Sequence, residues 1–370
     1  MPRPAILLSE AAKRLLLELR TGGPASRSRI AARLDIGHAT VTRLSRELIT
    51  LGLIAEQEAP ATRIGRGRPM VPLVLSGEGG YAVGATVHPG WAEIVALDCA
   101  GRLLAREEVP FDDPDPRAFA RLLEAQLRAI AGRPGILPYR FLGLGIASTG
   151  YVVDAAADRR WTVEWVAGWR AVPQARFFSD ALGLPVWVEN DGTVAALAEY
   201  YRPAIITRYR DILVFFLGHG LGGGVIADRR LVRGEHGNAG EVGRLFLDPA
   251  ARPSGLDLLH TLRRAGVAIH SLSDLPALLD DHGPLFAGWM DRVAGQLRHG
   301  IEAGAAWLDP GAVVISGTLP DALLTGLAER LRGWTTPGYH GAAPAIHASP
   351  LGSTAVAIGA AMLPIHALTA

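Results

Sequence analysis

The sequence of 370 residues contains one cysteine, Cys99, and one lysine, Lys13. A single cysteine excludes an intrachain disulfide and any zinc or iron–sulfur site built from several thiolates. The chain has no run of about 18 apolar residues, which a membrane-spanning helix needs. Its first residues also lack the charged segment and apolar stretch of a signal peptide. We therefore expect a cytoplasmic protein without a membrane anchor.

Charge is unevenly distributed along the chain, although the formal net charge is only +1. Residues 1–70 contain 12 Lys and Arg against 6 Asp and Glu, whereas the remainder contains 25 against 30. A basic N-terminal segment on a mildly acidic body favours a contact with nucleic acid at one end of the chain. The length predicts two or three domains.

The basic segment has the pattern of a helix-turn-helix. We expect a short helix over residues 26–34 with Ser26 as its N-cap, and a second helix over residues 38–51. Between them, Gly37 is expected to adopt the left-handed backbone of a tight turn. The second helix has a polar face whose side chains could reach phosphates or base edges: Thr40, Thr42, Arg43, Ser45 and Arg46.

Flanking segments complete the prediction of a winged helix-turn-helix over residues 1–76. An earlier helix over residues 6–20 supplies a third helix for the core. Two short strands, 53–56 and 70–75, enclose a basic, glycine-rich loop. Such a loop can place guanidinium groups in a minor groove. The side chains that we expect to contact DNA are Thr40, Thr42, Arg43, Arg46, Arg66 and Arg68.

The body, residues 77–370, alternates strands and helices and indicates an α/β fold with two lobes. Each half opens with strand hairpins, beginning near residues 81 and 211, which is the pattern of a duplicated ribonuclease-H-like core. A strand over residues 185–189 brings Asn190 and Asp191 to its carboxyl end, where α/β domains place ligands. Asp191 could instead cap the helix that follows.

Several motifs of the body resemble the ROK family of repressors, open reading frames and kinases. They are Gly143-Leu144-Gly145-Ile146-Ala147, Gly168-Trp169, Val188-Glu189-Asn190-Asp191, the stretch Leu217 to Gly224, and the stretch Gly234 to Gly243. The last is the most specific, because several motif residues recur there at fixed spacing. The repressor branch of the family has a winged helix-turn-helix that ends in a Gly-Arg-Pro wing, similar to Gly67-Arg68-Pro69.

Departures from the kinase pattern predict that the ATP site is lost. A ROK kinase has Asp-x-Gly-Gly-Thr in its first strand, where this chain has Val83-Gly84-Ala85-Thr86-Val87. Phosphoryl transfer depends on neutralising phosphate charge with a metal ion, so losing the metal-side carboxylate should be severe. His219 also replaces the small hydroxyl residue of the second phosphate turn. We therefore expect no enzyme activity and no cofactor.

The zinc site of the family is also not expected here. The family takes one histidine after Gly-Glu-x-Gly and three cysteines shortly beyond it. Arg244 stands at the histidine position, and residues 245–262 contain no cysteine. Arginine stays protonated and cannot bind a metal ion.

The resemblance implies a sugar site that is only partly kept. Asn190, Asp191 and Glu241 match the family residues that hydrogen-bond sugar hydroxyls, and Asp257 stands near a later glutamate of the family. Arg244 replaces the histidine of this set. Because arginine pairs well with carboxylate and phosphate, we expect an acidic or phosphorylated sugar.

Together these features predict a sugar-responsive transcriptional regulator, a repressor of a carbohydrate operon. It would bind operator DNA as a homodimer or homotetramer and sense a small sugar or sugar derivative with a catalytically dead body. One alternative is an active ATP-dependent sugar kinase with an accessory DNA-binding domain. Another is a DNA-binding scaffold whose sugar pocket is vestigial.

Overall fold

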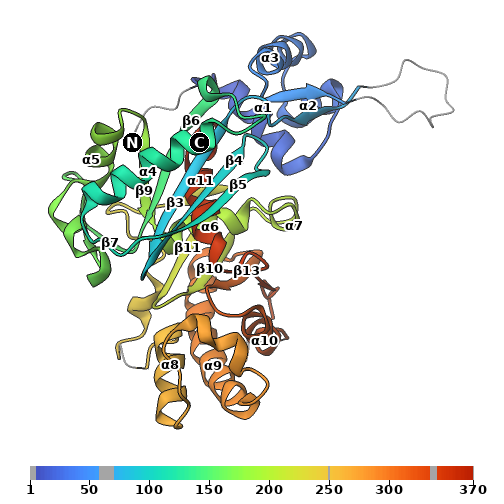
Figure 1. Ribbon diagram of the computed structural model, residues 1–370. Helices are drawn as coiled ribbons and strands as arrows, with labels where there is room; N and C mark the ends of the chain where they lie inside the picture. The colour runs from blue at the N-terminus through green and yellow to red at the C-terminus, as the bar shows by residue number, and fades with distance from the viewer. Residues whose placement is uncertain (1–5, 58–70, 249–250, 334–339, 370) are drawn as a thin grey trace. The chain divides into compact units, whose positions relative to one another are not determined.

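The computed structural model describes residues 6–57, 71–248, 251–333 and 340–369 (Figure 1). They form two compact units. Unit 1 consists of Met1–Ala147, Glu164–Val188 and Ala360–Ala370, and unit 2 consists of Ser148–Val163 and Glu189–Gly359. None of the helices in these ranges has the length and apolarity that a bilayer-spanning segment needs.

Unit 1 begins with three helices and a two-stranded sheet, as predicted. The helices are α1 (Glu10–Gly22), α2 (Arg27–Leu34) and α3 (His38–Thr50), and the antiparallel strands are β1 (Ile54–Glu56) and β2 (Leu73–Leu75). Ser26 caps α2 as expected, because its hydroxyl accepts a hydrogen bond from the amide of Arg29. Ala25 forms an additional bridge to Leu73. This arrangement is that of a winged helix-turn-helix, with its wing loop outside the described residues.

Two details of this segment differ from the sequence prediction. The left-handed residue of the turn is Asp35, with φ of 51°, and not Gly37, which lies at φ −63° as the N-cap of α3. Aspartate tolerates this conformation better than most residues. Ser45 is fully buried, and its hydroxyl donates to the carbonyl of Val41. It therefore faces the core and not the polar face of α3.

The sheet of unit 1 has the strand order β5-β4-β3-β6-β9. Its strands are β3 (Tyr81–His88), β4 (Trp91–Asp98), β5 (Leu103–Pro110), β6 (Phe141–Ser148) and β9 (Val186–Asn190). The helical segments that accompany them are α4 (Pro116–Ala131), η1 (Pro138–Arg140), η2 (Glu164–Ala171) and α5 (Gln174–Leu182). Trp169, at a family position, belongs to this core and packs on Phe119 and Phe178.

The sheet of unit 2 repeats this topology, with the order β12-β11-β10-β13-β14. In both sheets three antiparallel strands are followed by a strand that runs parallel to the first. The strands are β10 (Ile212–Leu217), β11 (Leu221–Ala227), β12 (Arg230–Val232), β13 (Ala312–Gly317) and β14 (Ala345–Ala348). The repeated order supports the predicted duplication of a ribonuclease-H-like core, which periodicity alone could not establish.

Helices cover the sheet of unit 2. One apolar cluster joins β10 and β13 to α8 (Gly255–Arg264), α9 (Gly283–Leu308) and α10 (Asp321–Leu331), which lie together in Figure 1. The helix α6 (Asp191–Tyr200) packs against β10 and β11 and is buried over residues 192–200. The remaining elements are β7 (Gly150–Asp154), β8 (Arg159–Thr162), α7 (Pro203–Ile206), η3 (Val242–Leu245), η4 (Leu272–Leu278), η5 (Gly352–Thr354) and α11 (Ala355–His366).

The glycine run of unit 2 lies within a strand and not in a turn before one. Gly222, Gly223 and Gly224 belong to β11 and pair with β10. A β-carbon on Gly224 would lie 2.5 Å from the β-carbon of Ala196 in α6, and one on Gly223 would lie 2.5 Å from the carbonyl oxygen of Val214. Glycine is therefore required for close backbone approach.

Two further glycines bring neighbouring segments onto β11. A β-carbon on Gly192, in the first turn of α6, would lie 2.6 Å from the amide nitrogen of Gly223. One on Gly240 would lie 2.7 Å from the carbonyl oxygen of Gly223. The start of α6 and the turn that ends at Gly240 thus both rest directly on the backbone of β11. We call this contact the glycine crossing (Gly192, Gly223, Gly224 and Gly240).

Substitution at the glycine crossing should destabilise unit 2. We expect Gly192→Ala to lower the free energy of unfolding by about 1–3 kcal/mol, since backbone must move to admit the new methyl group. Gly220→Ala is the matched control, because its β-carbon would meet no atom within 4 Å. Urea unfolding followed by circular dichroism measures both. Equal stability of the two variants would contradict the close backbone contact.

Candidate ligand site and candidate DNA-contacting helix

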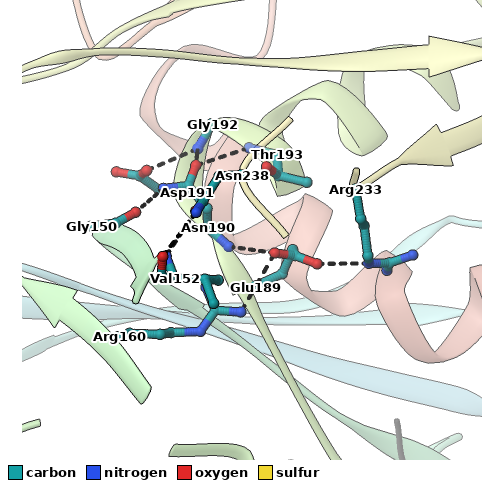
Figure 2. Close-up of polar contacts among 10 residues, drawn as sticks. All are labelled: Gly150, Val152, Arg160, Glu189, Asn190, Asp191, Gly192, Thr193, Arg233 and Asn238. Carbon is teal, nitrogen blue, oxygen red and sulfur yellow. Dashed lines mark hydrogen bonds and ion pairs between the residues drawn. The ribbon is translucent and has the colours of Figure 1, made fainter. Parts of the chain in front are cut away.

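The candidate ligand site is built on the first turn of α6. Asn190 is the N-cap of this helix, and its Oδ1 accepts hydrogen bonds from the amides of Gly192 at 2.8 Å and Thr193 at 3.2 Å (Figure 2). Its Nδ2 donates to the carbonyl of Gly150 at the start of the β7–β8 hairpin. Asn190 thus positions both the helix and the hairpin, and its side chain also hydrogen-bonds the carboxylate of Asp191.

Asp191 is the first residue of α6 and is half-buried. Its Oδ1 accepts from the amide of Gly192 at 2.9 Å, and the hydroxyl of Thr149 also donates to this carboxylate. Burial raises the pKa of Asp191 despite these hydrogen bonds. The carboxylate is therefore held in place by the protein, and its charged form is incompletely solvated.

Glu241 lies near Asp191, because it directly follows Gly240 of the glycine crossing. Burial and then the negative charge of Asp191 raise its pKa to about 7, while Arg244, Arg252 and Arg160 oppose the shift. At neutral pH its carboxyl group is therefore divided between acid and carboxylate forms. Because the folded-state pKa exceeds the ordinary value of 4.5, ionisation of Glu241 opposes folding, and this penalty grows as the pH rises from 4.5 to about 7.

A network of polar contacts fixes the segments around these carboxylates (Figure 2). The side-chain amide of Asn238 accepts from the backbone amide of Val152 and donates to its carbonyl, both at 2.8 Å. Buried Glu189 accepts from Nε of Arg233 at 2.8 Å, and Nη2 of Arg160 lies 3.6 Å from its other oxygen. The hairpin and the 234–241 turn are thereby linked to the end of β9.

Asp257, the loosest of the expected ligand residues, is engaged elsewhere in unit 2. Its carboxylate accepts from the indole nitrogen of Trp289 at 2.7 Å and from Nη2 of Arg292 at 2.8 Å. It is buried and joins α8 to α9. A ligand contact at Asp257 remains a prediction, and the other four expected residues, Asn190, Asp191, Glu241 and Arg244, are those that the structure brings together.

The second phosphate turn offers little to a nucleotide. The carbonyls of Gly218 and His219 accept from the amides of Gly255 at 2.8 Å and Leu256 at 3.2 Å, and the amide of Asp257 donates to Ser254. The first three amides of α8 are therefore already used and are not available to a phosphate. Burial also lowers the pKa of His219, which favours an uncharged imidazole.

The zinc site that the family resemblance implies does not fit this chain. Arg244 at the histidine position is exposed, and Cys99 lies in the turn after β4 of unit 1. Among the residues that the structure describes, no group of three or more His, Cys, Asp or Glu side chains could hold a metal ion. Arg244 instead acts on Glu241 as a nearby positive charge.

The expected DNA-contacting side chains of α3 differ in their surroundings. Arg43 and Arg46 are exposed, and Nη1 of Arg43 lies 3.7 Å from Glu47 of the same helix. Thr40 and Thr42 are half-buried, and the hydroxyl of Thr42 donates to the carbonyl of His38. Arg66 and Arg68 of the expected wing lie outside the described residues.

Comparison with known proteins identifies the family. The profile of the ROK family matches residues 90–255. Protein y4fQ of Sinorhizobium fredii, which is uncharacterized, is 30% identical over 98% of this chain and 91% of its own length. The chain belongs to the ROK family. A xylose repressor of Bacillus spizizenii is 24% identical over 64% of this chain and 60% of its own, and a glucokinase of Halalkalibacterium halodurans is 26% identical over 70% and 87%.

Solved structures show the same ROK fold. A ROK family transcriptional regulator, homolog of the E. coli MLC protein, is similar over 97% of this chain and 96% of its own, with a TM-score of 0.69 and 22% identity. A ROK glucokinase of Streptomyces griseus, in complex with glucose and AMPPNP, is similar over 77% of this chain and 99% of its own length. Its TM-score is 0.61 and its sequence identity is 23%. The regulator matches the length of this chain, including its N-terminal helices, better than the kinase does.

The sequence did not single out four residues that shape the site: Thr149, Arg160, Asn238 and Arg252. Asn238 lies inside the most specific motif, Gly234 to Gly243, so its spacing was visible but its contact with Val152 was not. Thr149 and Arg160 lie about 30 to 40 residues before Asp191, and only the β7–β8 hairpin brings them close. Apart from its charge, nothing in the sequence indicated that Arg252 belongs to the site.

The proximity of the two carboxylates can be tested by titration. We expect Asp191→Asn to lower the pKa of Glu241 from about 7 toward its ordinary value, because the repulsion that helps to raise it is removed. Selective ¹³C labelling of glutamate side chains allows the titration to be followed by NMR, with Glu241→Gln to assign the signal. Asp180→Asn, an exposed substitution on α5, is the control. An unchanged pKa in Asp191→Asn would show that the two groups are not coupled.

Proposed function

We propose that this ROK protein is a sugar-responsive transcriptional regulator, a repressor, which binds operator DNA through α3 and its wing. The observation that carries this proposal is the first strand of the kinase-like body. In β3, Ala82, Val83 and Ala85 are completely buried and aliphatic, and the strand from Tyr81 to His88 contains no carboxylate. Without that carboxylate the body cannot hold a metal–nucleotide as a ROK kinase does.

The region after β3 is also unlike a phosphate-binding turn. The imidazole of His88 stacks on the indole of Trp91 across the β3–β4 turn, with ring centroids 4.1 Å apart. Two bulky rings therefore flank the turn that directly follows this strand. Together with the occupied amides of α8, this supports a body that binds a ligand without transferring phosphate.

The remaining polar groups suit a sugar. Asp191 and Glu241 provide acceptors for several hydroxyl groups, and protonated Glu241 can also donate. Carbohydrate hydroxyls need such partners when they leave water. The similarity to a xylose repressor supports the regulatory role, while the similarity to a glucokinase supports the sugar site. We propose a division at residue 76 between the DNA-binding domain and the sensing body.

Regulation would couple two states of the protein. As a homodimer or homotetramer it would present paired α3 helices to a pseudo-palindromic operator. A sugar that binds one state better than the other shifts their populations and thereby changes the affinity for DNA.

Charge reversal on α3 tests the DNA-binding half of the proposal. We expect Arg43→Glu and Arg46→Glu each to weaken binding to a labelled fragment of the protein's own promoter region by about tenfold or more at low salt. The slope of log affinity against log salt should also fall by about 1 for each lost phosphate contact. Arg121→Glu on α4, also exposed, is the matched control and should bind like the parent protein. Unchanged binding in the α3 variants would overturn the assignment of this helix.

An ATP-consumption assay with a panel of sugars tests the alternative of an active kinase. We expect no turnover above background, since β3 lacks the metal-side carboxylate. Turnover of about one per second or more, an ordinary enzyme rate, would instead favour an ATP-dependent kinase with an accessory DNA-binding domain.

A further inference from the structure

Arginines outnumber carboxylates around the candidate ligand site. Arg160, Arg244 and Arg252 all act on Glu241, and Arg233 pairs with the neighbouring Glu189. These four arginines face three carboxylates: Glu189, Asp191 and Glu241. The cluster therefore keeps a positive charge even with Glu241 ionised, and protonation of Glu241 increases it.

The arginines of this cluster fall into two pairs. Arg160 and Arg233 both contact Glu189, so these two guanidinium groups are engaged within the protein. Arg244 and Arg252 lie on the segment after Glu241, and among the described residues neither has a carboxylate oxygen within 4.0 Å. The guanidinium groups without an ion pair of their own are therefore those of this second pair, in the segment that holds the zinc ligands in other family members.

Arg252 is held in position but keeps unused donors. Its side chain lies against Gly243, where an added β-carbon would be 3.4 Å from Nη1 and 3.5 Å from Cδ. Nη2 makes one long hydrogen bond, 3.4 Å, to the carbonyl of Phe246. Nε is buried and has no hydrogen-bond partner among the described residues. A guanidinium group has five N–H donors in a planar fork, and those on the terminal nitrogens of Arg252 are the ones that a planar or tetrahedral anion can reach.

We propose that Arg252, together with Arg244, binds the carboxylate or phosphate group of an anionic sugar whose hydroxyl groups contact Asp191 and Glu241. This inference rests on the proposed sugar-sensing function and specifies the class of its ligand. Arg252 is a specificity-determining residue in this assignment: it selects the acidic derivative over the neutral parent sugar. Asp191 and Glu241 repel an anion placed beside them, so the charged group must lie on the Arg244–Arg252 side of the site.

Matched sugar pairs test the assignment by calorimetric titration of the full chain. The pairs are glucose with glucuronate and glucose 6-phosphate, and xylose with xylonate and xylose 5-phosphate. We expect at least one acid or phosphate to bind about tenfold or more tightly than its neutral parent, with the preference decreasing as salt rises. Comparing the carboxylate and phosphate members identifies which anion the site takes.

Substitution of Arg252 separates binding from folding. In Arg252→Gln the preference for the anionic member should fall to about twofold or less, while the affinity for the neutral sugar changes little. Arg252→Lys keeps the charge without the planar fork and should retain part of the preference. Arg264→Gln, an exposed change at the end of α8, is the control and should behave like the parent protein. Thermal melting of each variant verifies that it is folded.

The outcomes distinguish this inference from the proposed sugar-sensing function on which it rests. Neutral and anionic members binding equally, or Arg252→Gln weakening both members to the same extent, would overturn the role of Arg252 and leave sugar sensing intact. Binding of neither member of any pair would overturn the inference together with the sensing half of the proposed function. The DNA-binding half of the proposed function is tested by separate measurements, and neither of these results bears on it.

Discussion

The candidate site depends on the close backbone contact at the glycine crossing. Gly192 and Gly240 approach the two sides of Gly223, at separations that a single methyl group would not allow. Asp191 precedes the first of these glycines and Glu241 follows the second. The backbone contact therefore fixes how close two carboxylates lie, and their mutual repulsion follows from it. Burial raises the pKa of Glu241 most, the charge of Asp191 raises it further, and nearby arginines only partly offset these two effects.

The function that we propose requires this kinase-like fold to sense a ligand without transferring phosphate. In that proposal Asp191 and Glu241 bind sugar hydroxyls, whereas phosphoryl transfer also requires metal-borne charge and a phosphate-binding turn. β3 contributes no carboxylate, and the amides of Gly255 and Leu256 at the start of α8 donate to the carbonyls of Gly218 and His219. In the proposed function, phosphoryl transfer is lost and the geometry around Asp191 and Glu241 is kept. Arg244 and Arg252 add positive charge where the family otherwise holds zinc.

Much of the fold could be predicted from periodicity and turn residues. β4 and α4 have the expected bounds, because their apolar patterns are strong and their ends are marked by Gly, Asp or Pro. Tertiary contacts decided the rest. Gly222–Gly224 resembled a turn because the close approach of α6 is invisible in the sequence, and Ser45 looked exposed because the helix packing that buries it is not encoded locally. Asn190 and Asp191 were found by their place at a strand end, whereas Asn238 and Arg252 depend on contacts between distant segments.

In the proposed function, a ligand at Asp191 changes the affinity of the protein for DNA. The most direct measurement is fluorescence anisotropy of a labelled fragment of the protein's own promoter region while the sugars and their acid and phosphate derivatives are titrated. We expect one of them to shift the affinity for DNA in the parent protein. Asp191→Asn should bind the fragment equally well and no longer respond. A full response in Asp191→Asn, or no response of the parent protein to any of these compounds, would contradict it.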